Sequence, residues 1–165
     1  WVSGRQGEAA AGLAVWQQDG KRELAHWRGL RQAFIAPRPR VALGQALAGV
    51  ASAAIDLSDG LAADAGHIAE RSGVALHLDP ACCRPSARLQ RWAGEAGARR
   101  LQLGGGDDYE LCFTAPRGAG GAVRAAARRA RTPVCCIGEV RQGEGVWWGD
   151  ERILDAAAGY RHFAG

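Results

Sequence analysis

The 165-residue sequence contains no methionine, and Lys21 is the only lysine among its 21 basic residues. Because a natural gene product starts with Met and this chain begins with Trp1, we expect it to be part of a longer protein. No apolar run approaches the ~20 residues that a membrane span needs, and no secretory signal precedes the first segment. With 47% hydrophobic and 23% charged residues, the composition is typical of a globular protein and predicts no membrane partner.

Several patterns of well-known catalytic and metal sites are also missing. The four histidines form neither His-x-x-x-His nor His-Glu-x-x-His, and neither a Cys-x-x-Cys spacing nor a Gly-x-Ser-x-Gly elbow for acyl transfer occurs. The five cysteines include two adjacent pairs, which rarely ligate one zinc ion. We expect reduced thiols, with Cys112 and one of each pair packed as small hydrophobes, and hence a cytoplasmic protein.

The net charge of +4 is modest and spread along the chain. Its densest basic cluster, RAAARRAR at residues 124–131, has two interpretations. It is either a stripe that binds nucleic acid, which would need aromatic or motif support, or the solvated face of an Ala-rich helix. We predict the solvated face and no nucleic-acid partner.

Helix and strand patterns alternate over most of the chain, which predicts a layered α/β domain. Two prolines in APRPR (36–40) bar a regular helix there, so we interpret this segment as the linker into the main domain. The hydrophobic spacing predicts helices over 7–18, 23–35, 41–50, 60–71, 84–95 and 119–131, strands over 51–57, 74–79, 109–115 and 134–140, and a hairpin over 144–154.

The stretch AIDLSDGLAAD places carboxylates at the end of a predicted buried strand, where a negative charge is costly unless a positive charge lies close to it. Asp56 at the strand end and Asp59 at the helix start are expected at one edge of the sheet, beside helix N–H groups that favour phosphate. Mg²⁺ would make this combination favourable, with Ser58 donating to a phosphate oxygen. Alternatively, Ser58 or Asp59 only caps the helix. Asp64 and His67 are expected to form an exposed pair.

A second stretch, LGGGDDYELCF (103–113), joins three glycines and two aspartates to a predicted strand. It is no P-loop or dinucleotide-binding fingerprint, because those place a helix after the glycines and the P-loop needs Lys followed by Ser or Thr. It is either a turn with acidic surface residues or a backbone kept small so that a ligand can approach. Neighbouring side chains on an extended chain point opposite ways, so only one of Asp107 and Asp108 is expected to face a ligand.

Taken together, SAAIDLSDGLAADAGHIAERSGV and LGGGDDYELCFTAP resemble the thiamine-monophosphate kinase family. VSGRQGEAAAGLAV, PRPRVALGQAL and GYRHF (159–163) resemble the same family in order and spacing. The resemblance implies the superfamily that includes aminoimidazole ribonucleotide synthetase, whose C-terminal α/β domain is layered, with a mixed sheet and flanking helices. It implies that residues 37–165 form this domain and that residues 1–36 are a remnant of the N-terminal ATP-binding domain with a connecting helix.

The resemblance further implies ATP- and Mg²⁺-dependent phosphorylation of thiamine monophosphate to thiamine diphosphate by a homodimer. By this likeness Asp56 and Asp59 hold Mg²⁺, Ser58 contacts ATP, and Asp107 matches a substrate-binding position. Ala157 stands where the family often has an aromatic residue that stacks on the substrate. Phosphoryl transfer depends on positioning and charge neutralisation, so no catalytic nucleophile is expected.

Departures from the family pattern leave alternatives open. Asp107 replaces the usual Glu, Ala157 replaces the aromatic residue, and GRQGE stands where the family usually has Gly-Thr-x-Gly-Asp. The family's N-terminal metal- and ATP-binding aspartates lie upstream of Trp1, so we expect the isolated chain to be inactive. The alternatives are another ATP-dependent phosphotransferase of the superfamily, and a non-catalytic binding fragment whose aspartates are only caps.

Overall fold

The computed structural model describes residues 1–19 and 27–153, which form two four-stranded sheets and six helices. The strand order is β2-β4-β1-β5 in the first sheet and β6-β3-β7-β8 in the second. The strands are β1 Val2–Ser3, β2 Ala53–Asp56, β3 Ala75–Leu78, β4 Leu111–Thr114, β5 Val134–Cys135, β6 Gly138–Arg141, β7 Gly145–Trp148 and β8 Glu151–Ile153. The helices are α1 Glu8–Asp19, α2 Arg28–Ile35, α3 Val41–Leu47, α4 Leu61–Ser72, α5 Ala87–Gly104 and α6 Gly120–Arg129.

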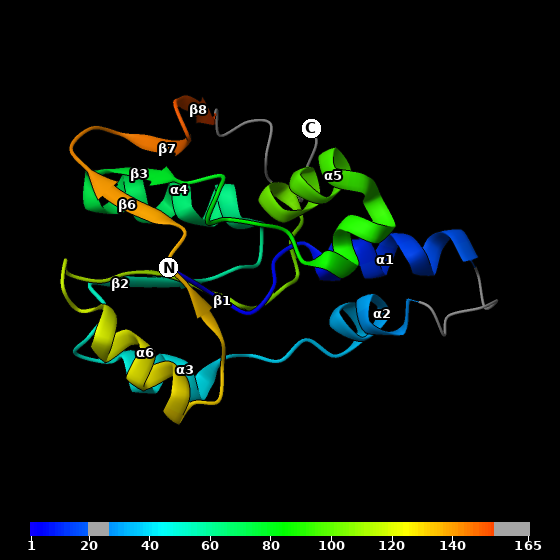
Figure 1. Ribbon diagram of the computed structural model, residues 1–165, viewed down its shortest axis with the longest axis horizontal. Coiled ribbons are helices and arrows are strands. Elements are labelled where there is room, and N and C mark those ends of the chain that lie inside the picture. The colour runs from blue at the N-terminus through cyan, green and yellow to red at the C-terminus, as the bar shows by residue number, and fades with distance from the viewer. Residues whose placement is uncertain (20–26, 154–165) are drawn as a thin grey trace.

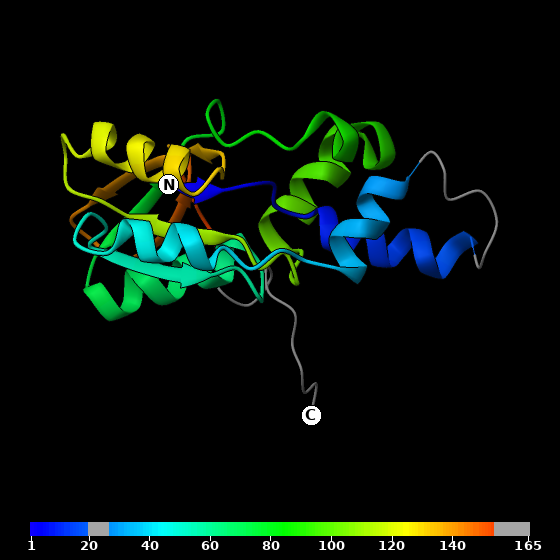
Figure 2. The same cartoon turned by 90° about the horizontal axis from the view of Figure 1, so that it is seen from below.

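The elements are stacked in layers (Figures 1 and 2). Helices α3 and α6 pack on one face of the first sheet, where Phe113 and Leu43 are fully buried. Helix α4 contacts strands of both sheets and buries Leu61 and Ile68 in the largest core cluster. Helices α1, α2 and α5 form a third group around Leu30 at the other end of the molecule. The expected α/β architecture with a mixed sheet and flanking helices is confirmed, because β3 pairs parallel with β7 and antiparallel with β6.

Most predicted elements are present, and the differences have local reasons. The predicted strand 134–140 is two strands, because β5 pairs with β1 while β6 pairs with β3 in the other sheet. Helix α5 extends well beyond the predicted 84–95, since the chain kinks at Gly94 (φ 68°, ψ 176°) and then resumes the helix. The hairpin expected over 144–154 is confirmed by the antiparallel pair β7–β8. The predicted helix 23–35 lies partly outside the described residues.

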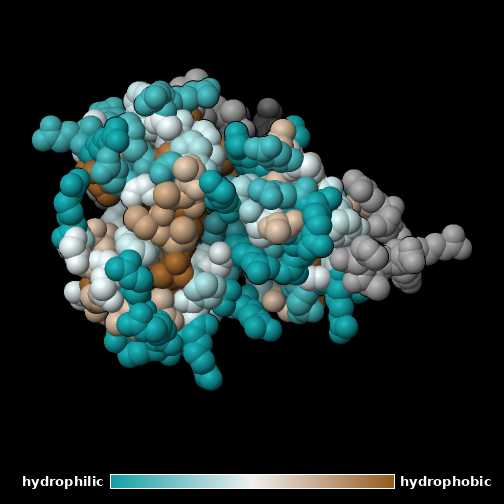
Figure 3. All heavy atoms as spheres, viewed as in Figure 1, coloured by the Kyte–Doolittle hydropathy of each residue, from teal (hydrophilic) through white to brown (hydrophobic). Residues whose placement is uncertain are grey.

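The surface of α6 agrees with its expected solvated basic face. Val123 and Ala126 are fully buried, whereas Arg124 and Arg128 are exposed on the opposite side. None of the helices in the described ranges is long and apolar enough to cross a bilayer. Apolar atoms instead gather in a hollow on the face shown in Figure 3, between the second sheet and the layer of α3 and α6.

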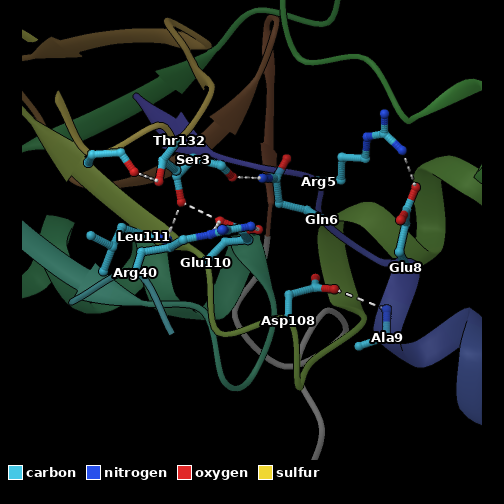
Figure 4. Close-up of polar contacts among 11 residues, drawn as sticks. Ser3, Arg5, Gln6, Glu8, Ala9, Arg40, Asp108, Glu110, Leu111 and Thr132 are labelled. Atoms are coloured by element: carbon cyan, nitrogen blue, oxygen red, sulfur yellow. Dashed lines mark hydrogen bonds and ion pairs between the residues drawn. The ribbon is translucent and has the colours of Figure 1, made fainter. Parts of the chain in front are cut away.

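The first strand is tied to the rest of the fold by a buried polar network (Figure 4). The Glu110 carboxylate accepts hydrogen bonds from Ser3 Oγ (2.5 Å) and from the Arg40 guanidinium, whose Nε lies 2.7 Å away. Ser3 Oγ also accepts from the Leu111 N–H. The hydrogen bond to Glu110 raises the pKa of Arg40. Because Val2–Ser3 belongs to the first sheet and α1 packs on α5, residues 1–19 pack closely against the rest of the described fold, and the boundary at residue 36 stays a prediction.

Removal of Arg40 is expected to test this network. Glu110 is 6% exposed. In Arg40→Ala its buried carboxylate keeps only the side-chain hydrogen bond from Ser3, so the free energy of unfolding should fall by about 2–4 kcal/mol. The matched control is Arg99→Ala, which removes an exposed i,i+4 pair with Glu95 and a contact with the Trp148 ring. It should change stability by less than about 1 kcal/mol. Urea unfolding measures both, and equal effects would contradict this account.

Candidate functional site

The two acidic stretches singled out in the sequence are neighbours in the structure. Strands β2 and β4 pair antiparallel from Ala53↔Thr114 to Asp56↔Leu111. The pairing continues past the strand ends, where Tyr109 N–H donates to Leu57 O and Asp107 N–H donates to Ser58 O, both at 2.9 Å. The backbones of the two motifs are therefore hydrogen-bonded to each other, which places Ser58 and Asp107 side by side.

Two glycines allow this close approach. A Cβ on Gly106 would overlap the Ser58 carbonyl oxygen, and a Cβ on Gly60 would lie 2.9 Å from the carbonyl carbon of Gly104. Gly60 also has φ 112°, which L side chains rarely adopt. For the glycines of 104–106, the sequence left open a turn with acidic surface residues or a backbone kept small so that a ligand can approach the two aspartates. In the structure, the space that Gly60 and Gly106 leave is filled by the backbone of the neighbouring loop.

The predicted metal and ligand residues gather at this joint. Asp56 is the exposed last residue of β2, Ser58 and Asp59 are half-buried, and Asp107 is exposed. Among the described residues, no ion pair involves Asp56, Asp59 or Asp107. Carboxylate oxygens are ligands that Mg²⁺ prefers. Among the described residues, however, the ligand atoms that lie close together are those of Asp59, Asp64 and His67, and Asp56 is not part of this group.

Asp64 differs from its expected role. It is 2% exposed, and its Oδ2 accepts the N–H groups of Asp59 and Gly60, both at 3.1 Å. The N-cap of α4 is Gly60, so neither Ser58 nor Asp59 caps the helix with its side chain. Burial raises the pKa of Asp64, and the nearby Asp59 carboxylate also acts in this direction. The expectation of an exposed Asp–His pair is wrong for Asp64, whereas His67 is exposed.

A group of possible metal ligands forms around Asp64. Single ligand atoms of Asp59, Asp64 and His67 all lie within 4.8 Å of one another. The sequence did contain a signal for the burial of Asp64, since it lies three residues after Leu61 and four before Ile68, on the apolar face of α4. A carboxylate on such a face needs internal hydrogen bonds, and the turn before α4 provides them.

The two neighbouring aspartates of the second motif do different things. Asp107 (φ 64°) and Tyr109 (φ 49°) both have left-handed backbones, which are uncommon for residues other than Gly, although Asp adopts them more often than most. Asp108 between them is buried, and at the start of α1 its carboxylate accepts the N–H groups of Gly7 (2.5 Å) and of Ala9 (3.1 Å; Figure 4). The expected opposite orientation is therefore observed, but a left-handed rather than an extended backbone produces it.

The capping role of Asp108 was not expected from the sequence. Residues 5–7 before α1 contain no Ser, Thr, Asp or Asn, so the sequence near the helix offers no short side chain to accept its first N–H groups, and this absence was the available signal. Burial raises the pKa of Asp108 to about 7, although its bonds to Gly7 and Ala9 oppose the shift. Asp108, which follows the candidate substrate residue Asp107, thus stabilises the start of α1.

The described residues also contain a cavity that lies apart from this joint. Ala157 lies outside the described residues. A cavity of about 570 Å³ opens between β4 and β6 and is lined by Trp1, Phe113 and Ile137, but not by the candidate metal or substrate residues. Of the five free cysteines, Cys112 and Cys83 are buried as expected, but neither member of the 135–136 pair is.

Comparison with known proteins gives consistent results. No family model matches the chain. The chain is 43% identical over 143 residues to thiamine-monophosphate kinase of Salmonella typhimurium, covering 85% of the chain and 43% of that protein. It is 39% identical over 171 residues to the Escherichia coli K12 enzyme of the same name, covering 99% of the chain and 52% of that protein. The chain spans about half the length of the curated relatives it matches.

Solved structures agree in fold. The crystal structure of thiamine-monophosphate kinase from Stenotrophomonas maltophilia K279a matches with a TM-score of 0.84 and 44% identity, over 92% of this chain and 49% of that one. The AaThiL complex with AMPPCP and TMP matches with a TM-score of 0.81 and 31% identity, over 98% of this chain and 50% of that one. The fold of the chain is therefore that of these kinases.

Gly106→Ala should separate the two motif loops. Its Cβ would overlap the Ser58 carbonyl oxygen, so the backbone has to move, and we expect a loss of about 1–3 kcal/mol in the free energy of unfolding. The control is Gly121→Ala in α6, where nothing lies within 4 Å of the added Cβ and stability should rise by about 0.5–1 kcal/mol. Thermal unfolding of both variants is the measurement, and an unchanged Gly106→Ala protein would be evidence against the close approach.

The stability contributed at Asp108 should depend on pH. Its pKa is raised to about 7 in the fold from about 3.9 in an unfolded chain, so the folded state binds the extra proton between these values. Its contribution is then greatest below about pH 4, falls as the pH rises to about 7 and is constant above that. The difference in unfolding free energy between the wild type and Asp108→Asn should follow this curve in urea titrations, and a flat difference would contradict it.

Proposed function

Because the chain belongs to the thiamine-monophosphate kinase family, we propose that it supplies part of a kinase that phosphorylates thiamine monophosphate with ATP to give thiamine diphosphate. The single observation that supports this most is the backbone joint between the two motifs. It joins the backbones of Ser58 and Asp107, and Asp59 follows Ser58 directly in the chain. Asp59 and Asp107 have no ion-pair partner among the described residues. A phosphate-handling site needs such residues to be close to each other and free to bind.

We assign the residues as follows. Asp56 and Asp59 would hold Mg²⁺, which when bound neutralises phosphate charge and orients phosphate oxygens. The Ser58 hydroxyl would donate a hydrogen bond to ATP. Asp107, which as a carboxylate only accepts hydrogen bonds, suits an amino group of the thiamine substrate. The aromatic contact at the position of Ala157 would be absent.

The mechanism that follows needs no covalent intermediate on the protein. The chain's own side chains bind and orient the two phosphate-bearing substrates, and the exposure of Asp107 leaves it open to the acceptor. Phosphoryl transfer is accelerated mainly by such positioning and by charge stabilisation. The buried Asp64 and Asp108 contribute by holding the loops that carry these groups.

The alternative within the superfamily is an ATP-dependent phosphotransferase that acts on an acceptor other than thiamine monophosphate. Asp107 is one methylene shorter than the Glu usual in the family, which would leave room for a different or water-bridged acceptor. Acceptor-dependent release of ADP separates the two cases. A non-catalytic fragment is less well supported, because the structure shows that neither Ser58 nor Asp59 caps α4 with its side chain.

The wider properties of the protein are proposals as well. We propose a homodimer in the full-length protein, no nucleic-acid or membrane partner, and a cytoplasmic location, which suits five free thiols. We also propose that the isolated chain is inactive, because it spans only about half of its relatives. In this proposal residues 1–36 derive from the N-terminal ATP-binding domain and residues 37–165 form the C-terminal domain.

Asp59→Asn in the full-length protein tests the metal assignment. Loss of a ligand that steadies phosphate charge should lower the rate of thiamine diphosphate formation roughly 10²-fold or more, and excess Mg²⁺ should restore part of it. The control Asp150→Asn changes an exposed carboxylate in the turn between β7 and β8 and should leave the rate unchanged. Product formation is followed by chromatography, and a fully active Asp59→Asn protein would refute the assignment.

A further inference from the structure

We infer that Asp64 is a positioning residue of the proposed metal site, because its carboxylate holds the Ser58–Gly60 turn in the shape that keeps the Asp59 side chain free for a divalent cation. This inference rests on the proposed function, in which Asp59 is a metal ligand. Asp64 itself would contact the turn and not the metal ion.

The hydrogen bonds of Asp64 are the first support. One carboxylate oxygen, Oδ2, receives both the Asp59 and the Gly60 N–H groups at 3.1 Å. The side chain is 2% exposed, so these bonds are shielded from water and contribute more than they would on the surface. Both donors lie within the turn that carries the candidate ligand.

The division of roles between the aspartates is the second support. Ser and Asp before a helix usually turn their side chains back to accept the first helix N–H groups. Here Gly60 is the N-cap and has no side chain to offer, while Asp64 reaches back from within the helix to take the N–H groups of the turn. Neither Ser58 nor Asp59 caps α4 with its side chain, so both side chains can face a ligand.

The proximity of charges is the third support. Ligand atoms of Asp59 and Asp64 lie within 4.8 Å of each other, with His67 at the same distance or less. Two carboxylates this close repel each other, and a bound cation would relieve that repulsion. Asp64 therefore fixes the Asp59 backbone and also adds negative potential to the place where a cation would bind.

Three variants of the full-length protein test the inference, with Mn²⁺ alone as the probe and electron paramagnetic resonance as the binding assay. Asp64→Ala removes both hydrogen bonds and should raise the Kd for Mn²⁺ about 10- to 100-fold, as loss of a residue that orients a metal ligand does. Asp64→Asn keeps an acceptor oxygen and should recover most of that loss. Asp59→Asn should weaken Mn²⁺ binding at least as much as Asp64→Ala.

Amide hydrogen exchange of peptides covering residues 57–61 separates positioning from ligation. Asp64→Ala should speed exchange of the Asp59 and Gly60 amides, whereas Asp59→Asn should leave it unchanged. The matched control is Asp79→Asn, since Asp79 also accepts a backbone N–H, from Ala81 at 2.8 Å, but in an exposed turn. It should change neither Mn²⁺ affinity nor exchange at residues 57–61.

The outcomes that would overturn the inference are distinct from those that would overturn the proposed function. Unchanged Mn²⁺ affinity in Asp59→Asn refutes the metal assignment, whatever Asp64 does. Weak binding in Asp59→Asn with normal binding in Asp64→Ala refutes the positioning role alone. If Asp64→Asn binds Mn²⁺ as poorly as Asp59→Asn, then Asp64 is itself a ligand and the positioning role is wrong. This last comparison decides the matter even if Asp64→Ala does not fold.

Discussion

The backbone pairing between β2 and β4 is the constraint on which the candidate site depends. It does not stop where the strands end but continues through Leu57 and Ser58 to Tyr109 and Asp107. Loops are usually more mobile than the strands they connect. Here the two loops that follow β2 and precede β4 are hydrogen-bonded to each other through their backbones. The backbone from which these side chains extend is consequently held by main-chain hydrogen bonds and by the close contacts at Gly60 and Gly106.

The acidic residues around this joint fall into two groups with different physical roles. Asp64, Asp108 and Glu110 are buried, and each receives hydrogen bonds from the protein's own backbone or side chains. Asp59 and Asp107 are more exposed, and neither forms an ion pair with another described residue. A carboxylate that is satisfied internally serves the fold, whereas one that is not can serve a ligand. This difference in partners, and not the number of acids, is what suggests a functional site.

The sequence predicted the elements better than their connections. Segments such as 41–50 and 60–71 carry a complete periodic pattern of their own, so α3 and α4 appear close to where they were expected. The separation of β5 from β6 depends on which distant strand each one meets, and a local pattern holds no such information. The same holds for Asp108, whose role as a cap depends on a helix about a hundred residues earlier in the chain.

The segment from Asp107 to Glu110 has a consequence for how the protein acquires its native state. Within four residues it bonds to Ser58, to Arg40, which is 70 residues away from its partner, and to Gly7, which is 101 residues away. Contacts of such long sequence separation form slowly, because a large loop must close before they provide any stabilisation. The candidate site would therefore form late in folding. A folding intermediate that already contains the helices would still lack the site.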